Sequence, residues 1–257
     1  MAVEDTGMAD SVAPPKFGYR WTICALLFAA TTINYMDRQT LGILAPTLQR
    51  ELGWSEQDYG NITSWFSFAY AIGFLGAGRM MDRLGVRKGY AISIVTWSAA
   101  AMSHALAVTT FQFSLARAAL GFGESGNFPG AIKTTAEWFP RKERALATGI
   151  FNAGTNVGAI LTSLAIPPIA LHFGWRAAFL ATGTLSLIWL IAWLTIYRTP
   201  ENQPRVSPEE LRYIRRDPVE ATTSVSGGKV RGHRPWWDSE RGKFTTNPGW
   251  GVYAVGG

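Results

Sequence analysis

Six long apolar segments constrain the fold of this chain more than any other feature. A helix needs about 20 mostly apolar residues to cross a membrane, and the six segments meet or approach that length. They cover residues 21–48, 59–81, 89–108, 111–132, 145–171 and 175–197. The alternative is a soluble protein of six buried helices, but loop charges that alternate along the chain disfavour it. The sequence therefore predicts an all-α membrane protein, a six-transmembrane-helix bundle.

The loops predict how this bundle is oriented. Lys and Arg gather in DRLGVRKG after the second segment and in FPRKERA after the fourth. Lys16 and Arg20 precede the first segment, and Arg198 and Arg205 follow the last. The intervening loops carry fewer basic and more acidic residues. Because cytoplasmic loops are enriched in Lys and Arg, we expect a multi-pass protein of the inner (plasma) membrane with both termini in the cytoplasm.

The chain divides into four stretches by composition. Residues 1–19 are acidic and interrupted by proline, without the apolar core of a signal peptide, and we expect a disordered cytoplasmic tail. Residues 20–198 hold the six segments. Residues 199–222 are expected to form a cytoplasmic linker with a short amphipathic helix in SPEELRYIRRD, which Ser207 with Glu209 or Glu210 would start. Residues 223–257 contain no apolar run of spanning length, and a truncated, disordered tail is expected.

Composition and motifs exclude several functions. The net charge of +6 fits basic cytoplasmic loops, and no basic run interleaved with aromatics indicates nucleic-acid binding. The single cysteine, Cys24, rules out a multi-cysteine metal site and is expected to be buried and inert. Neither G-x-S-x-G, HExxH nor a P-loop occurs. We therefore expect no enzyme, no catalytic residue, no metal and no cofactor.

Four charged residues lie inside the apolar segments. Asp37 and Arg38 are in the first segment, and Arg117 and Glu124 are in the fourth. Each costs roughly 2.5–3.5 kcal/mol near a helix centre. Arg117 and Glu124 are seven residues apart and so share a face of a helix. The four charges sum to zero, and we expect them to pair with one another. Two structural ion pairs are the alternative, but ionisable residues inside a membrane favour a function.

The four charges suit proton-coupled anion transport. Arginine presents a planar, permanently charged fork that matches a substrate carboxylate. A carboxylate that loses its water favours its protonated form. On protonation the arginine would lose its internal partner and become free to hold an anion. We therefore expect these side chains to surround a water-filled cavity.

Other polar residues could complete such a site. Asn34 and Arg38 are four residues apart and share a face. Tyr35 and Asp37 point roughly 160° apart on a straight helix, so they converge only if the helix bends or the tyrosine side chain reaches across. Hydroxyls and amides that suit a polyhydroxylated substrate are Tyr70 in the second segment and Asn152, Thr155 and Asn156 on one face of the fifth. His104 lies at the outer end of the third segment, where we expect an exposed or interfacial histidine rather than a proton relay.

The loop GRMMDRLGVRKG resembles a family signature. It matches the G-x-x-x-D-[RK]-x-G-x-[RK]-[RK] motif of the major facilitator superfamily. The matching residues are Gly78, Asp82, Arg83, Gly85, Arg87 and Lys88. The resemblance implies that the six helices form one half of a major facilitator fold. It also implies that Asp82 braces a cytoplasmic gate against helix ends of the other half.

Further stretches narrow the resemblance. NYMDR, RAALGFGESGNFPG, WFPRKERA and FGWRAAF resemble the anion:cation symporter branch, and within it the hexuronate and sugar-acid transporters. The resemblance covers roughly residues 17–218. It implies proton-coupled transport of a hexuronate or galactonate type of sugar acid. The residues it implies for substrate binding are Tyr35, Arg38, Tyr70, Arg117 and Asn156, and those for proton coupling are Asp37 and Glu124. Some relatives have glutamine at the position of Thr155.

The family has twelve helices in two halves, whereas this sequence holds six apolar segments. We therefore expect a truncated N-terminal half, which a second half-transporter or a copy of itself could complete. The expected partners are the lipid bilayer, an organic anion and protons. Two alternatives stay open: a non-transporting membrane remnant or sensor, and a carrier for another organic or inorganic anion.

Overall fold

A computed structural model describes residues 18–216, 237–238 and 243–244 of the chain. The chain divides into two compact units, Met1–Asp217 and Pro218–Gly257. The described part of the second unit is two short antiparallel strands, β1 (Trp237–Asp238) and β2 (Lys243–Phe244). Residues 1–17 of the expected N-terminal tail and most of the tail expected over residues 223–257 lie outside the described residues. The last residue of the first tail, Tyr19, is described and bonded to Glu210 and Ile196.

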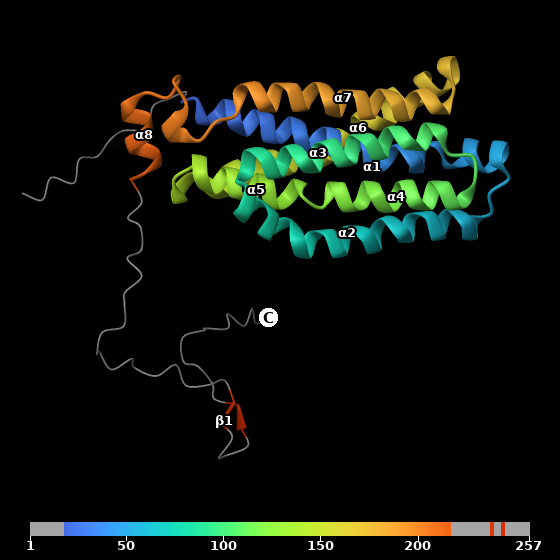
Figure 1. Ribbon diagram of the computed structural model, residues 1–257, viewed down its shortest axis with the longest axis horizontal. Helices are drawn as coiled ribbons and strands as arrows, with labels where there is room; N and C mark the ends of the chain where they lie inside the picture. Colours follow the sequence, from blue (N-terminus) through green and yellow to red (C-terminus); the bar gives the residue numbers. More distant parts are fainter. Residues whose placement is uncertain (1–17, 217–236, 239–242, 245–257) are drawn as a thin grey trace, which may run out of the picture. The chain divides into compact units, whose positions relative to one another are not determined.

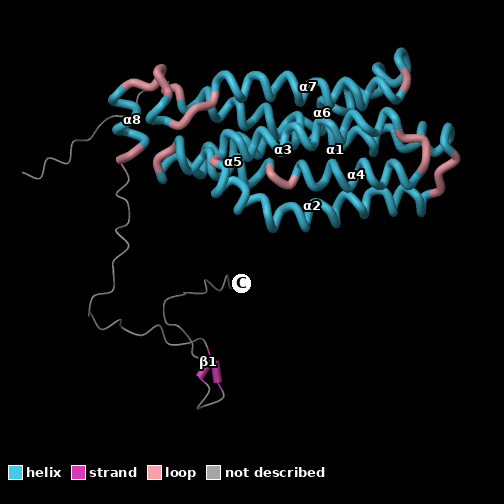
Figure 2. Tube along the Cα trace, in the orientation of Figure 1, coloured by secondary structure: helices cyan, strands magenta, loops and turns pink. Residues whose placement is uncertain are grey.

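The first unit is built of helices throughout (Figures 1 and 2). The long ones are α1 (Arg20–Leu52), α2 (Glu56–Leu84), α3 (Val86–Ser103), α4 (Thr110–Glu124), α5 (Asn127–Trp138), α6 (Arg141–Phe173) and α7 (Trp175–Ile196). The shorter ones are α8 (Pro208–Ile214) and the 3-10 turns η1 (His104–Leu106) and η2 (Pro200–Asn202). Each of the six apolar segments lies on these helices, the fourth on α4 and α5 together. The predicted all-α six-segment bundle is confirmed.

The fourth segment is interrupted at Ser125 and Gly126, which form a turn between α4 and α5. Neither α4, of 15 residues, nor α5, of 12, is long enough to cross a membrane alone. By length and composition, α6 and α7 are the two described helices that qualify as spans. Fewer helices qualify than the six spans expected. The fourth segment is divided into two short helices, and the other helices that do not qualify carry polar side chains that lower their mean hydropathy.

Glycines let α6 lie close against α1. A Cβ added at Gly154 or Gly158 would overlap the backbone carbonyl oxygens of Phe28 and Thr32. Small residues at this spacing permit close approach of helix backbones. Gly121 and Gly123 act in the same way on α4, against Phe66 of α2 and Trp97 of α3. Gly154 and Gly158 stand four residues apart on the face of α6 that packs on α1.

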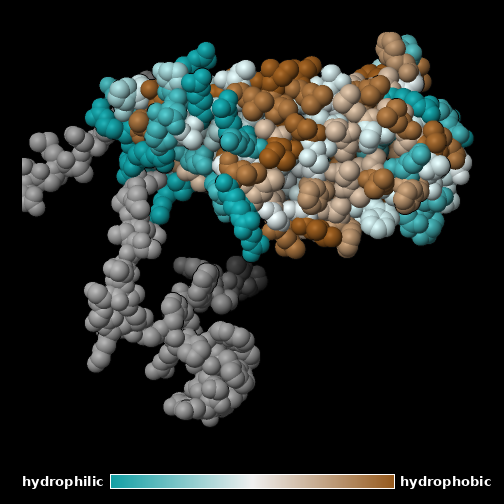
Figure 3. Space-filling view, in the orientation of Figure 1, coloured by the Kyte–Doolittle hydropathy of each residue, from teal (hydrophilic) through white to brown (hydrophobic). Residues whose placement is uncertain are grey.

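On the face that Figure 3 shows, the surface of the bundle is mostly apolar in the middle and mostly polar at the ends. Leu75, Leu164 and Ile191 are 75%, 69% and 65% exposed, although each is aliphatic. α6 buries a single stripe of residues against α1 and exposes most of its other side chains. Such a continuous apolar belt is unfavourable in water and suits the hydrocarbon of a bilayer.

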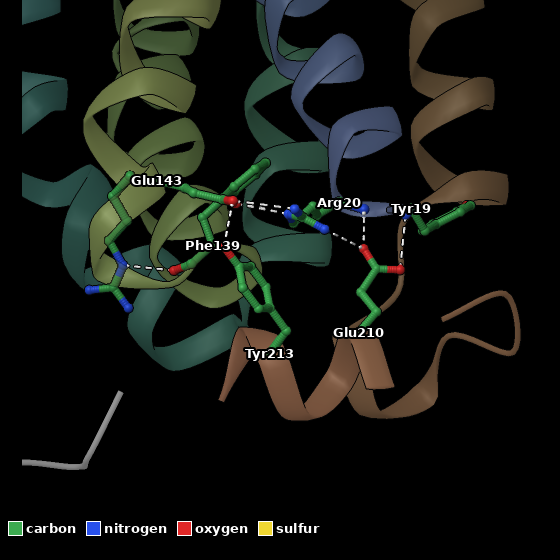
Figure 4. A network of polar contacts seen from close by, with 7 residues as sticks. Tyr19, Arg20, Phe139, Glu143, Glu210 and Tyr213 are labelled. Atoms are coloured by element: carbon green, nitrogen blue, oxygen red, sulfur yellow. Dashed lines mark hydrogen bonds and ion pairs between the residues drawn. The ribbon is translucent and has the colours of Figure 1, made fainter. Parts of the chain in front are cut away.

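A buried ionic cluster joins the linker helix α8 to one end of the bundle (Figure 4). Arg20 at the start of α1 binds Glu143 of α6 at 2.9 Å and Glu210 of α8 at 3.4 Å. Glu210 also accepts the backbone N–H groups of Tyr19 and Arg20, at 3.0 and 3.1 Å. Tyr213 of α8 donates its hydroxyl to Glu143 at 2.7 Å. The amphipathic helix expected in the linker therefore forms, capped by Ser207, and is fixed to α1 and α6.

Candidate functional site

Arg38 of α1 and Glu124 of α4 form an ion pair inside the bundle. The Arg38 Nε and Nη2 atoms donate to Oε2 of Glu124 at 3.0 and 2.9 Å. The Glu124 side chain is fully buried, whereas that of Arg38 keeps 25% of its surface exposed. The second carboxylate oxygen, Oε1, has no hydrogen-bond partner among the described residues. The pair is thus buried at its acidic end and accessible at its basic end.

Three aromatic rings surround the Arg38 guanidinium. Its central carbon lies 4.9 Å from the rings of Tyr35 and Phe66 and 5.0 Å from the ring of Tyr70. Tyr70 in turn stacks on Phe66, with ring centres 5.9 Å apart. A guanidinium is attracted to the faces of such rings. The cage therefore fixes the direction of the Arg38 fork without neutralising its charge.

Asp37 points away from this pair and toward α7. Ser186 donates its hydroxyl to Asp37 Oδ2 at 2.8 Å, and the Asp37 side chain is 2% exposed. The other carboxylate oxygen, Oδ1, has no partner among the described residues. Consecutive helix residues point about 100° apart, so Asp37 and Arg38 necessarily face different neighbours.

Arg117 of α4 contacts backbone rather than a carboxylate. Its two terminal nitrogens donate to the carbonyl oxygen of Arg38, both at 3.3 Å. Its central carbon lies 5.8 Å from the ring of Phe66. Arg117 is 3% exposed, and its Nε has no partner among the described residues. Phe66 therefore lies against two arginines, and Arg117 ties α4 to the backbone of α1 beside the ion pair.

The expectation of four mutually paired charges is wrong in its details. Arg117 and Glu124 do lie on the buried face of α4. However, the direct ion pair among the four is Arg38 with Glu124. Asp37 and Arg117 are instead satisfied in part by a hydroxyl and a carbonyl. The physical reason is that a buried charge can be stabilised by oriented dipoles as well as by an opposite charge.

The other predicted polar residues have different environments. Tyr35 and Tyr70 meet at Arg38, and Tyr35 does not converge on Asp37. Asn34 is fully buried, with neither amide atom bonded among the described residues. Asn156 is exposed on α6, and Asn152 and Thr155 are partly buried there. No hydrogen bond described for the bundle joins Asn156 to Arg38 or Glu124.

His104, which was expected to be exposed or interfacial, is not exposed. Its side chain is fully buried and stacks on Phe179, with ring centres 4.9 Å apart. Its Nδ1 lies 2.8 Å from the carbonyl oxygen of Ala100. η1 turns this end of the third segment inward, where aromatic residues cover it. Cys24, by contrast, is buried as expected.

The signature loop connects α2, α3 and α5. Asp82 accepts from Nζ of Lys133 on α5 at 2.7 Å, and Lys133 also donates to the Met81 carbonyl at 3.0 Å. Gly85 has φ of +77°, a conformation that L side chains rarely adopt, and it starts α3. Arg87 donates to the carbonyl oxygen of Leu194 on α7.

Asp82 keeps 71% of its side chain exposed, so it remains available to a further partner. Of the other signature residues, Arg83 and Lys88 are exposed and Gly78 has open space beside it.

Sequence reasoning missed Phe66, Ser186 and Lys133. Phe66 sits between other apolar residues in WFSFAY, and nothing in that string indicates a contact with arginine. Ser186 is separated from Asp37 by 149 positions. Lys133, however, is a basic residue near the end of an apolar segment, and that signal could have drawn attention to it.

Comparison with known proteins agrees with this architecture. Residues 27–251 match the Major Facilitator Superfamily, so the match continues beyond residue 218, where the sequence resemblance was expected to end. The chain is 36% identical over 242 residues to the hexuronate transporter of Escherichia coli K12. It is 33% identical over 241 residues to the galacturonate transporter of Dickeya chrysanthemi. Each alignment covers 92% of this chain, but only 56% and 70% of those transporters.

Solved structures share the fold. The bundle superposes on a bacterial homolog of the human lysosomal transporter Spinster with a TM-score of 0.64 and 22% identity, over 71% of this chain and 45% of that one. It superposes on a proton:xylose symporter with a TM-score of 0.64 and 17% identity, over 77% and 49%. The chain thus corresponds to about half of each full transporter.

Proposed function

The chain belongs to the major facilitator superfamily, a family of multi-pass membrane transporters, and we propose that it carries a sugar acid across the membrane together with a proton. Its relatives include a hexuronate transporter, a galacturonate transporter and a protein named as a probable L-galactonate transporter. Because the chain spans 56% of the length of the hexuronate transporter it matches, its transport unit would comprise this half and a second six-helix half. A second copy of the chain is the other candidate for that partner.

The accessible end of the Arg38–Glu124 pair is the observation that carries this proposal. Arg38 is held in an aromatic cage, is one quarter exposed, and is neutralised by a single buried carboxylate. A substrate carboxylate fits the same guanidinium fork as Glu124 does. The two anions would therefore compete for Arg38, while Tyr35 and Tyr70 offer hydroxyls to the sugar.

Protonation of Glu124 would shift that competition in favour of the substrate anion. Protonation removes the charge that pairs with Arg38, and the freed guanidinium then holds the substrate anion. Release of the substrate restores the internal pair and returns the proton. Asp37 would respond separately, because it is bonded to Ser186 on α7 and would link protonation to the position of that helix. Arg117 would hold α4 against α1 during these steps.

We also propose that both ends of the helical unit face the cytoplasm. The basic loops precede α3 and α6 and flank the start of α1 and the end of α7. The Arg20 cluster joins the start of α1 to α6 and α8, so these ends lie together. Asp82 would meet the second half at this side, as its exposure permits.

Uptake into proteoliposomes tests the proposal. Labelled glucuronate, galacturonate and galactonate are offered with and without an inward proton gradient, to this chain and to residues 1–222 followed by the second half of the hexuronate transporter. The extended chain should accumulate at least one sugar acid when the gradient is applied. Absence of uptake of all three, in a correctly folded extended chain, would contradict the proposal.

Charge-neutral variants test the coupling. Glu124→Gln and Asp37→Asn in the extended chain should lose gradient-driven accumulation but retain exchange of labelled for unlabelled substrate. Glu209→Gln removes an exposed acid from α8 and should behave as the parent does. Full accumulation by both of the buried-site variants would show that these acids do not couple transport.

A further inference from the structure

A second polar site lies at the end of α7, apart from Arg38 and Glu124. A cavity of about 280 Å³ opens there between the start of α1, the end of α7 and the linker. Its lining consists of Tyr19, Thr195, Ile196, Arg198, Gln203, Pro204 and Arg205. The two arginines are exposed and come from opposite sides of η2. A concave site with two cations at a helix end suits an anionic group.

The polar groups of Tyr19, Ile196 and Gln203 in this cavity already have hydrogen-bond partners within the chain. The carbonyl oxygen of Ile196 accepts from the Tyr19 hydroxyl at 3.2 Å and from the Gln203 amide at 2.9 Å. Gln203 is 7% exposed, so this part of the linker is fixed against the bundle. The cavity is therefore a formed feature of the fold, and the groups it leaves for a ligand are the arginine side chains.

Within residues 18–216, carboxylates do not pair with these two arginines. Glu201, three residues after Arg198 and four before Arg205, pairs with Arg215 of α8. Glu210 is bonded to Tyr19 and Arg20. Among the described residues, Arg198 and Arg205 have neither an ion-pair nor a hydrogen-bond partner. In the part of the chain that the structure describes, the two cations that face this cavity are therefore available to an external anion.

The surroundings of the cavity indicate that this anion belongs to a lipid. α7 is one of the two helices apolar and long enough to span a membrane. Ile188 and Ile191 are 59% and 65% exposed on it, and with Thr195 they follow helical spacing toward the cavity. Arg198 lies two residues after the end of the helix, at the level where headgroups meet water. A phospholipid whose phosphate binds the arginines would thus place its acyl chain on this apolar face.

We propose that the cavity binds one anionic phospholipid, whose phosphate lies between Arg198 and Arg205 and whose acyl chain lies along Ile191 and Ile188. The lipid would join the start of α1, the end of α7 and the linker at one point. This site is independent of the transport proposed for Arg38 and Glu124. Its test is accordingly a binding measurement and not an uptake measurement.

Native mass spectrometry of the full chain in detergent measures the binding. The chain is titrated with phosphatidylglycerol, with phosphatidylcholine of the same acyl chains, and with inorganic phosphate. We expect one phosphatidylglycerol to bind more tightly than phosphatidylcholine. Arg198→Gln and Arg205→Gln should each weaken that binding about fivefold, and together about 25-fold. The double variant Lys142→Gln/Arg212→Gln removes two exposed cations from the same end and should bind as the parent does.

Ile191→Ser provides a variant that leaves both arginines in place. It should weaken phosphatidylglycerol and phosphatidylcholine alike, because it removes apolar contact with the acyl chain. Three outcomes would overturn the proposal: equal binding of the two phospholipids, unchanged binding in the Arg198→Gln/Arg205→Gln variant, or inorganic phosphate that binds as tightly as the lipid. The last would identify a site for a free anion.

Discussion

The guanidinium of Arg38 donates two hydrogen bonds to one oxygen of Glu124, and the other oxygen of that carboxylate is buried without a partner among the described residues. The pair therefore holds the two helices α1 and α4 together through a single acceptor atom. Such an arrangement is sensitive to the loss of either charge, since the remaining one would be buried alone.

Arg38→Leu should lower the free energy of unfolding by about 3 kcal/mol, because it leaves the Glu124 carboxylate buried and unpaired. The double variant Arg38→Leu/Glu124→Leu should recover most of that loss, since no isolated charge remains. Thermal unfolding in detergent measures both. A double variant that is no more stable than Arg38→Leu would show that the pair contributes through its shape and not through its charges.

Phe66→Leu should weaken binding of glucuronate about fivefold, because the ring orients Arg38 and contacts Arg117. Phe68→Leu is the matched control, since Phe68 is 59% exposed and should leave affinity unchanged. Equilibrium binding to the extended chain measures the difference. Equal effects of the two substitutions on glucuronate affinity would show that Phe66 does not contribute to the substrate site.

Gly158→Ala should destabilise the bundle by about 1–3 kcal/mol, because its new methyl group would overlap the Thr32 carbonyl and separate α6 from α1. Gly149→Ala on the same helix meets open space and should be neutral or stabilise by up to about 1 kcal/mol. The two melting temperatures should shift in opposite directions or by clearly different amounts. Indistinguishable shifts would contradict the close contact.

Glu210→Ala should release α8 from the bundle, because it removes the acceptor of two backbone N–H groups and a partner of Arg20. Cleavage by trypsin at Arg212 should become about tenfold faster or more. Glu209→Ala changes an exposed acid on the same helix and serves as the control. If both variants are cut at the rate of the parent, the cluster does not hold the linker.

Asp58 at the start of α2 should give a pH-dependent stability. Its carboxylate accepts the Ser55 hydroxyl at 2.7 Å and the Ser55 amide at 2.9 Å, which holds its pKa below the usual 3.8. A lowered pKa in the folded chain means that the stabilisation is present above pH 3.8 and disappears as the pH falls through the folded value. Asp58→Asn should therefore melt below the parent at about pH 6, and the two should converge as the pH falls through the folded pKa of Asp58. A constant difference would contradict this.

Much of the fold could be predicted because it follows from local patterns. Long apolar runs give helices, Ser55 and Ser207 start α2 and α8 as N-caps, and Gly85 turns the chain into α3. The break of the fourth segment was less visible, because GFGESGNFPG reads as a glycine-rich span. At the break, Ser125 packs beside Gly73 of α2 and Gly126 packs beside Ser93 of α3, and these neighbours come from distant parts of the chain.

The sequence by itself determined that Asp37 and Arg38 cannot face the same neighbour, because adjacent residues on a helix point about 100° apart. It also determined that Arg117 and Glu124 share a face of α4. Only the tertiary structure decided that Arg38 meets Glu124, that Asp37 meets Ser186 and that Arg117 meets a carbonyl group. Helix periodicity fixes the direction of a side chain, whereas its partner depends on how separate helices pack, and that is set by the fit of all their surfaces together.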